Sequence, residues 1–354
     1  NSENSFIQHS LIIAKIKDKI KNYQNLEKIL SELPNGSILV GGYIRDLLLD
    51  RINPYPDVDV VIPNNSLDTG KNIAEKFSGK FLILDQSRNI VRIIFKDFTI
   101  DIANRTHELL TEDLKSRDFT INSIGFSLDN GELIDPGDGI HDLNNSLLRS
   151  FRSENLLDDP LRILRCFRFV SELNFHVEPH LLEFIELNKL QLKTVSVERI
   201  QYELKKIVKG KEALKTVEFL NQIKIFDWIQ AYENNYSNSL SYINFENFSQ
   251  DEIDKFFPIA YLKELLGESV IKNFKFSRSD SLAINSLRKW SEKLKDKSIS
   301  NFTEIERFDL HKDLEKFLPA FILYLPKKFH KEWLKRWRNK KDKLFHPRNY
   351  INGN

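Results

Sequence analysis

The feature that most constrains the fold is a short segment, DVDVV, in which two acids alternate with valines. This period of two is typical of a β-strand, so Asp57 and Asp59 share one face while Val58 and Val60 face apolar packing on the other. Two carboxylates on one face repel each other unless a cation lies between them. Mg²⁺ is the ion we expect, because it binds carboxylate oxygens and leaves coordination positions for substrate phosphates. The segment therefore predicts a metal-binding strand.

Two glycines before this strand predict a site for an anion. Gly41 and Gly42 follow an apolar segment at 38–40, expected to be a strand, and precede a short helix at 44–50. Because glycine has no side chain, the backbone at these two positions can approach a triphosphate, and the N-terminus of the following helix directs N–H groups toward it. Taken alone, a double glycine can be a plain turn and a DxD segment a strand end. Together they indicate a nucleotide site beside a metal.

Composition narrows the class of protein. The 354 residues are 41% hydrophobic and 29% charged, which is typical of soluble globular proteins and sufficient for several domains. No apolar run approaches the ~20 residues of a membrane helix, and the first ten residues lack the pattern of a secretory signal. The single cysteine, Cys166, excludes an internal disulfide and favours a reducing compartment. We therefore expect a cytoplasmic protein without a membrane segment.

The pattern changes from mixed to helical near residue 156. The elements predicted before this point are an amphipathic helix at 11–33, a helix at 67–77 and strands at 80–84, 90–95 and 98–102. The helices predicted after it lie at 160–173, 197–209, 212–223, 251–266, 279–295, 309–323 and 327–344. The Asn- and Ser-rich segment 231–250 is the best linker candidate. This order predicts an α+β protein.

The arrangement GGxxRD…DxD, which includes Arg45 and Asp46, resembles the nucleotidyltransferase signature of the polymerase β superfamily. Its form is similar to that of class II tRNA nucleotidyltransferases and bacterial poly(A) polymerases. The resemblance implies a small mixed-sheet, polymerase-β-like head followed by an all-helical neck, body and tail. The implied boundaries are a catalytic head at 1–148, a neck at 149–212 and a body and tail at 213–354. The implied nucleotide-binding residues here are Gly41, Gly42, Arg45 and Asp46.

Two further segments complete the predicted head site. Asp101, in the strand FTIDIAN, supplies a third carboxylate, which we expect to help activate the attacking hydroxyl. The segment SRDFTIN resembles the family motif that selects ribose, which implies nucleotide contacts from Arg117, Asp118 and Asn122. Ser116 stands where the family usually has a first arginine. The alternative for this segment is a helix N-cap.

The segment DDPLRILRCFR resembles the family motif EDxxRxxR, in which an acid and an arginine act as a protein template for the incoming base. The implied residues are Asp159, Arg162 and Arg165. On a helix Asp159 and Arg162 would face the same way. A carboxylate accepts from the amino group of cytosine or adenine and a guanidinium donates to the ring nitrogen, whereas uracil and guanine present the reverse pattern. The alternative is a solvated, salt-bridged helix face.

The C-terminal part predicts contact with RNA. Residues 327–348 hold ten Lys and Arg against two acids, and Trp333 and Trp337 are interleaved at a helical spacing. The alternative is a basic solvated face over a buried tryptophan stripe. The candidate RNA-binding residues are Lys327, Lys328, Lys331, Lys335, Arg336 and Arg338.

The connection between Asp101 and Arg117 bears on the activity. It is only 15 residues, IANRTHELLTEDLKS, whereas CCA-adding members of the family usually carry a longer flexible loop here. The resemblance therefore implies addition of CC to tRNA from CTP, with release of pyrophosphate and Mg²⁺ as cofactor. The alternatives are CCA addition, which also uses ATP, then A addition or poly(A) synthesis. An RNA-binding protein with an inactive head is the non-enzyme alternative.

Overall fold

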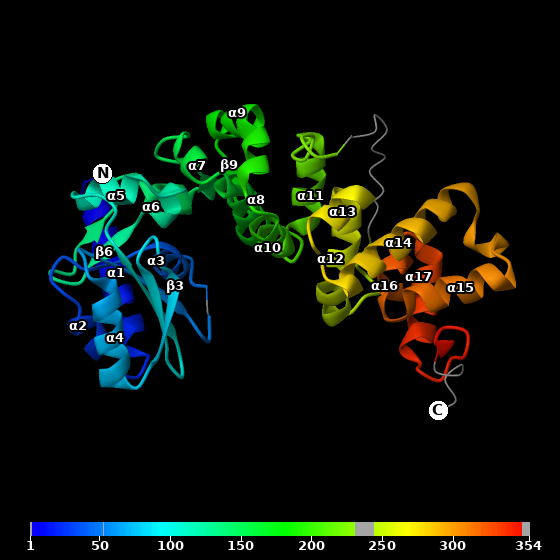
Figure 1. The fold of residues 1–354 in the computed structure, drawn as a ribbon, viewed down its shortest axis with the longest axis horizontal. Coiled ribbons are helices and arrows are strands. Elements are labelled where there is room, and N and C mark those ends of the chain that lie inside the picture. Colours follow the sequence, from blue (N-terminus) through cyan, green and yellow to red (C-terminus); the bar gives the residue numbers. More distant parts are fainter. Residues whose placement is uncertain (1, 52, 231–243, 349–354) are drawn as a thin grey trace. The chain divides into compact units, whose positions relative to one another are not determined.

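The computed structural model describes residues 2–51, 53–230 and 244–348 and divides the chain into two compact units (Figure 1). The first unit contains the residues up to 158 together with His176–Leu181. The second contains Asp159–Phe175 and the residues from Leu182 onward. The three-part division at 148 and 212 stays a prediction.

A seven-stranded mixed sheet forms the centre of the first unit, with the order β3-β4-β5-β2-β1-β6-β7. The strands are β1 (Ile38–Leu39), β2 (Asp57–Ile62), β3 (Lys80–Asp85), β4 (Ile90–Ile94), β5 (Thr99–Asn104), β6 (Gly125–Ser127) and β7 (Leu133–Ile134). Only β2 and β5 pair in parallel, and the other neighbouring strands of this sheet are antiparallel. A small mixed sheet followed by helices confirms the predicted α+β fold.

The first unit also contains short and long helices. They are α1 (Ser2–Lys21), α2 (Leu26–Ser31), α3 (Gly41–Leu48), α4 (Ser66–Phe77), α5 (Leu110–Lys115), α6 (Gly139–Asn144) and α7 (Asn155–Asp158). The helix predicted at 11–33 is therefore two helices. Asn25 has a φ of 67°, a left-handed conformation that asparagine tolerates better than most residues. A two-stranded parallel sheet, β8 (Leu147–Leu148) with β9 (His176–Val177), completes the unit.

The two faces of the sheet differ in chemistry. Helix α4 packs on β3, β4 and β5, and a methyl group added at Gly70 of α4 would lie 2.7 Å from Val91 Cγ2. The side chains on this face are buried and apolar: Val58, Val60, Val91, Ile93, Ile100 and Ile102. Because strand side chains alternate, the opposite face carries the acids of β2, as predicted from DVDVV, and Asp101 of β5.

Helices dominate the second unit (Figure 1). They are α8 (Leu161–Leu173), α9 (Pro179–Asn188, which begins in the first unit), α10 (Val197–Ile207), α11 (Ala213–Gln222), α12 (Gln250–Leu265), α13 (Glu268–Asn273), α14 (Arg278–Asp296), α15 (Glu304–Leu314), α16 (Leu318–Ile322) and α17 (Lys327–Arg338). The helix predicted at 309–323 is divided at Glu315, which has a φ of 42°. Of the predicted linker 231–250, residues 231–243 lie outside the described residues.

Across the described ranges, no helix combines the length and the apolar character that a membrane crossing requires.

Candidate active site

The two acids of β2 lie beside the start of α3, on the face of the sheet opposite α4, which is called the open face below. Asp57 is exposed and accepts a hydrogen bond from the Thr99 hydroxyl, whereas Asp59 is half-buried. The predicted shared face is thus present, and the two carboxylates differ in their access to solvent.

The predicted glycines bring the backbone close to Asp59. Helix α3 begins at Gly41 rather than at residue 44, so both glycines belong to its first turn. Gly41 has a φ of +69°, and a methyl group added there would lie 3.2 Å from Asp59 Oδ2; one added at Gly42 would lie 3.7 Å from it. Only glycine combines this left-handed conformation with so close an approach at low cost. The start of α3, where we expect an anion to bind, and Asp59 therefore lie together.

The electrostatics of Asp59 fit a cation site. Burial, followed by the negative charge of Asp101, raises the pKa of Asp59 to about 6, although the charge of Arg117 opposes the shift. Among the residues that the structure describes, no group of three or more His, Cys, Asp or Glu is arranged to hold a metal ion. Asp57 and Asp59 suit an ion that uses one or two carboxylates and takes its remaining ligands from phosphates and water.

The third acid, Asp101, is engaged by an arginine that sequence reasoning missed. Asp101 neighbours Asp59 in the parallel pairing of β5 with β2, so the side chains share the open face. The guanidinium of Arg92, on β4, donates two hydrogen bonds to the Asp101 carboxylate, an arrangement called a fork below. Nε donates to Oδ1 at 2.7 Å and Nη2 donates to Oδ2 at 2.8 Å. The available signal was that Arg92 is the only polar residue of the predicted strand 90–95. The predicted role of Asp101 in activating a hydroxyl stays a prediction.

Residues of the SRDFTIN motif join α3 in a buried polar network. Arg45 Nη1 donates to Asn122 Oδ1 at 2.8 Å, and Asn122 Nδ2 donates to Asp118 Oδ1 at 3.1 Å. All three residues are at most 7% exposed. Arg45 also donates to Asp46 through Nε at 3.0 Å. Among the described residues, no side chain caps the short 3-10 helix at Thr120–Asn122; instead, Asp118 and Asn122 form a buried network with Arg45 beside the glycine turn.

Arg117 extends from this motif toward the acids. Its Nη1 would lie 3.7 Å from a methyl group added at Gly41, and its charge opposes the rise in the pKa of Asp59 that burial and Asp101 cause. Its Nη2 is 4.0 Å from Asp113 Oδ2, and its buried Nε has no hydrogen-bond partner within the described part of the chain. Such a guanidinium suits an anionic substrate group.

The residues predicted to read the base lie in the second unit, at the start of α8. Asp159 precedes the helix rather than lying on it, and its carboxylate accepts from the Leu161 N–H at 3.3 Å. Arg199 of α10, another residue that the sequence did not single out as functional, donates to both Asp159 oxygens at 3.1 and 2.6 Å. Burial raises the pKa of Asp159, but the hydrogen bond and charge of Arg199, with a contribution from Arg162, outweigh it and leave the pKa lowered.

A second pair of charges joins α8 to α10. Arg168 Nη1 donates to both oxygens of the buried Glu203 at 3.1 Å. The Arg165 guanidinium lies 5.6 Å from the centre of the Phe169 ring, and that of Arg168 lies 4.7 Å from it on the same helix. These contacts fix the face of α8 that carries the predicted template residues.

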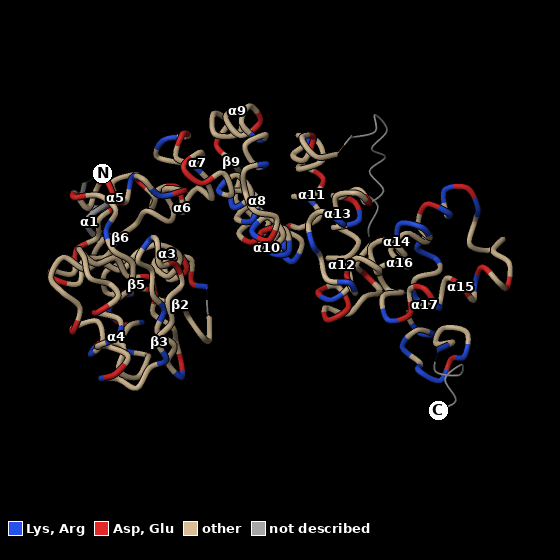
Figure 2. The backbone as a smooth tube through the Cα atoms, viewed as in Figure 1, with Lys and Arg blue, Asp and Glu red and all other residues tan. Residues whose placement is uncertain are grey.

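Helix α17 is rich in lysine and arginine (Figure 2), and its charged residues differ in their partners. Arg336 donates to Asp342, with a shortest contact of 2.8 Å, and Arg338 donates to Glu252 at 2.7 Å, so both have internal carboxylate partners. Trp337 packs edge-to-face on Phe256 and is buried, and Trp333 packs on His311. Of the tryptophan stripe considered from the sequence, Trp337 is buried and Trp333 is half-buried.

The lysines of α17 remain available to solvent. Four lysines are exposed: Lys327, Lys328, Lys331 and Lys335. Lys327 also pairs with Glu246 at 2.6 Å. RNA binding by this helix stays a prediction, and the lysines suit it better than the two arginines do.

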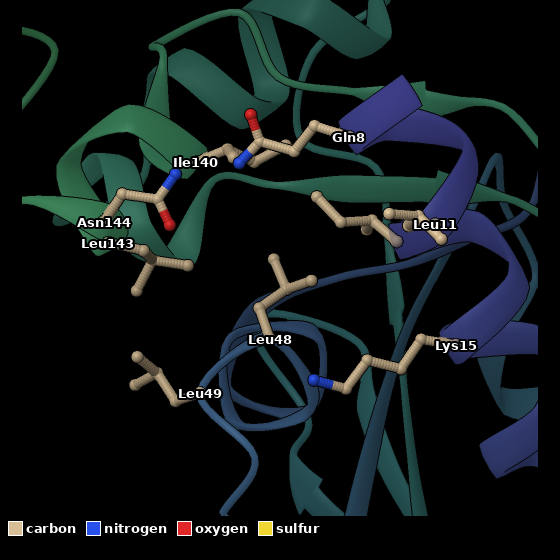
Figure 3. A pocket seen from close by; sticks show the side chains of 9 residues that line it. Gln8, Leu11, Lys15, Leu48, Leu49, Ile140, Leu143 and Asn144 are labelled. Carbon is tan, nitrogen blue, oxygen red and sulfur yellow. The ribbon is translucent and has the colours of Figure 1, made fainter. Parts of the chain in front are cut away.

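A small cavity lies elsewhere in the first unit, at the C-terminal end of α3 (Figure 3). Its volume is about 280 Å³, and its lining residues are Gln8, Leu11, Ile12, Lys15, Leu48, Leu49, Ile140, Leu143 and Asn144. None of the predicted site residues lines it.

A mixed sheet with acids on one face and a glycine-initiated helix beside them defines the class of nucleotidyltransferases. Residues 37–149 match the family described as the poly A polymerase head domain, and residues 174–231 match the probable RNA and SrmB-binding site of polymerase A. A relative from Synechocystis sp., named a CC-adding tRNA nucleotidyltransferase, is 30% identical over 92% of this chain and 84% of its own length. This chain belongs to the tRNA nucleotidyltransferase family, which is a family of enzymes.

Other relatives show the range of activities within this family. An A-adding tRNA nucleotidyltransferase from Halalkalibacterium halodurans is 29% identical over 59% of this chain and 53% of its own length. A solved structure of a CCA-adding enzyme with ATP has a TM-score of 0.75 at 25% identity, over 94% of this chain and 86% of that one. Similarity of this kind supports the family without distinguishing among its CC-, A- and CCA-adding members.

Proposed function

We propose that this chain adds two CMP residues to the 3′ end of tRNA without a nucleic-acid template. The 3′-hydroxyl oxygen of the RNA attacks the α-phosphorus of CTP in line, a new phosphodiester bond forms, and the bond to the β-phosphate breaks with loss of pyrophosphate. The hydroxyl proton leaves to solvent. The observation that carries the proposal is the open sheet face, where Asp57 and Asp59 lie beside the glycine-initiated start of α3.

Asp57 and Asp59 would hold Mg²⁺. The bound ion supplies a lowered hydroxyl pKa and neutralises charge on the phosphates. The chain itself supplies the surroundings: the first turn of α3 directs N–H groups toward the triphosphate, and Arg117 adds a positive charge beside it. Asp118 and Asn122, fixed by Arg45, are placed to bind the ribose hydroxyls.

Asp159 and Arg162 would choose the base. Arg199 holds the Asp159 carboxylate as an anion in one orientation, which suits acceptance from an exocyclic amino group. A uracil would place a carbonyl oxygen against that carboxylate, and the unpaired acceptors would disfavour it. Arg165, on the same helix, would contact the nucleotide from the next turn.

The restriction to two additions rests on the connection between β5 and α5, residues 105–109. Asp113 Oδ1 accepts from both the N–H and the hydroxyl of Thr106 at 2.7 Å. Arg105 donates to the Gly36 carbonyl and to the Glu108 carbonyl, each at 3.1 Å. A segment so short and so tied to its own unit has little freedom to reshape a base site between C and A.

The experiment uses two tRNA transcripts, one ending before CCA and one ending in CC, each incubated with CTP and ATP. The first should lengthen by two C residues and then stop, and the second should remain unextended. Addition of A to either transcript would contradict the restriction to CC, and a long A tail would instead indicate a poly(A) polymerase.

The tRNA would be held in part by the exposed lysines of α17, Lys327, Lys328, Lys331 and Lys335, whose charges suit phosphates. We propose that the reaction takes place in the cytoplasm, where tRNA is available. An enzyme complexed with tRNA is among the solved structures of the same fold, which supports this choice of partner.

A further inference from the structure

We propose that Arg92 binds the phosphate backbone at the 3′ end of the RNA, and that Asp101 positions Arg92 rather than binding a metal ion. This inference rests on the proposed function and goes beyond it, because it assigns a residue to the RNA side of the site.

The first support is the fork between the two side chains. Both Asp101 oxygens accept from Arg92, at 2.7 and 2.8 Å. A guanidinium has five N–H donors and the fork uses two of them, so three remain. The Arg92 side chain is 31% exposed, whereas Asp101 is 17% exposed. The arginine therefore keeps donors at the surface while the acid is occupied beneath it.

The second support is the charge around Arg92. Its Nη2 lies 4.0 Å from Asp57 Oδ1, in addition to the fork on Asp101. The carboxylates raise the pKa of Arg92, Asp101 most strongly, so it remains a cation. A fixed cation among the acids lets a phosphodiester approach a face that would otherwise repel it.

The third support is the order of residues across the sheet. At one level, Arg92 of β4 pairs with Asp101 of β5, and Asp101 pairs with Asp59 of β2. The Val40 N–H donates to the Asp59 carbonyl at 3.0 Å, and Gly41 begins α3 immediately afterward. Arg92 and the anion-binding end of α3 thus lie on opposite sides of Asp59.

The chemistry assigns these two sides. In an in-line displacement, the attacking oxygen and the leaving pyrophosphate lie on opposite sides of the α-phosphorus. The pyrophosphate belongs to the glycine side, because the N–H groups of α3 are there. The RNA that carries the attacking hydroxyl therefore approaches from the side of Arg92, and its last phosphodiester lies within reach of the free donors.

The test compares Arg92→Gln, Asp101→Asn and the double variant with the wild type. The control is Arg88→Gln, which removes the same charge from the exposed turn of the same β-hairpin. We expect Arg92→Gln to raise the KM for tRNA about tenfold while the KM for CTP changes little, and to reduce the slope of log affinity against log salt by about 0.7. Asp101→Asn should produce the same pattern, and the double variant should be no worse than either. Arg92→Lys should recover part of the RNA affinity.

Mn²⁺ binding, followed by electron paramagnetic resonance without nucleotide, separates the two roles of Asp101. Asp101→Asn should keep the wild-type Mn²⁺ affinity within about threefold, whereas Asp59→Asn should lose it. Loss of Mn²⁺ affinity in Asp101→Asn, or an unchanged KM for tRNA in Arg92→Gln, would overturn the proposal. RNA affinity is also measured by fluorescence anisotropy without CTP. Failure of the wild type to add CMP would refute the proposed function, whereas anisotropy would still decide the role of Arg92.

Discussion

At the scale of single residues, the site depends on how closely the backbone of α3 approaches Asp59. Two observations favour glycine at position 41. Its positive φ is a backbone conformation that other residues rarely adopt. In addition, a methyl group added there would lie 3.2 Å from Asp59 Oδ2, on the carboxylate that would hold a metal ion.

Gly41→Ala should therefore affect both stability and chemistry. The left-handed conformation should cost about 1 kcal/mol of unfolding free energy, and the added methyl group should lower CMP transfer at least about tenfold by displacing Asp59. Gly131→Ala is the matched control, because Gly131 has a φ of +70° and faces Lys17 rather than the acids. Chemical denaturation and single-turnover kinetics measure the two effects. Equal transfer rates in the two variants would refute the link between Gly41 and Asp59.

The residues that the sequence could predict are those whose chemistry appears within one short segment. Asp57 and Asp59 alternate on one strand, so their shared face follows from the period of the strand alone. Arg92 and Arg199 act on acids that lie in other elements, and such partners depend on strand register or helix packing. A lone arginine in an apolar strand was the only local signal for the first of them.

At the scale of elements, the pairing of α8 with α10 determines how Asp159, the acid that we propose reads the base, is held. Arg199 contributes the fork on Asp159, and Arg168 with Glu203 fixes the same two helices. Helix lengths were predicted well where periodicity was uninterrupted, as at α8 and α14. The divisions at Asn25 and Glu315 were missed, because a single residue with positive φ leaves the apolar periodicity on both sides intact.

Arg199→Ala should weaken base choice more than transfer itself. Without the fork, the Asp159 carboxylate can rotate, so we expect the ratio of kcat/KM for CTP over UTP to fall about tenfold. Lys209→Ala, just beyond the end of α10, removes a charge without touching Asp159 and should leave the ratio unchanged. An unchanged ratio in Arg199→Ala would show that Asp159 does not need this partner.

The buried His311 of α15 should make the free energy of unfolding depend on pH. Burial, followed by the charge of Arg336, lowers the pKa of His311 to about 3, whereas an unfolded histidine titrates near ~6.5. Protons therefore bind the unfolded chain preferentially between these values, and stability is lost as the pH falls from ~6.5. At pH 5, His311 should have lowered the free energy of unfolding by about 2 kcal/mol relative to its value well above pH ~6.5.

His311→Phe keeps an aromatic ring against Trp333 and removes this titration. The variant should lose the change in unfolding free energy between pH 7 and pH 5 that His311 causes, and His180→Gln, an exposed change, should retain it. All four tryptophans lie in the second unit, so their fluorescence follows its unfolding. An identical pH profile in wild type and His311→Phe would contradict the assignment.

At the scale of the whole molecule, the change from mixed to helical pattern predicted the α+β fold, and similarity to enzymes of the tRNA nucleotidyltransferase family along most of the chain agrees with it. The division of labour that we propose follows the two units. The first carries the acids, the glycines and the ribose-binding residues, and the second carries the acid and arginines that would read the base.

The most direct test of this account is CMP transfer to a tRNA transcript that lacks its CCA end, measured for the wild type and for Asp59→Asn. We expect the wild type to add two C residues in the presence of Mg²⁺. Asp59→Asn should add none while its affinity for the transcript stays within about twofold, because the variant loses a metal ligand and no RNA contact. Transfer by a clean preparation of Asp59→Asn, or no transfer by the wild type, would contradict the account.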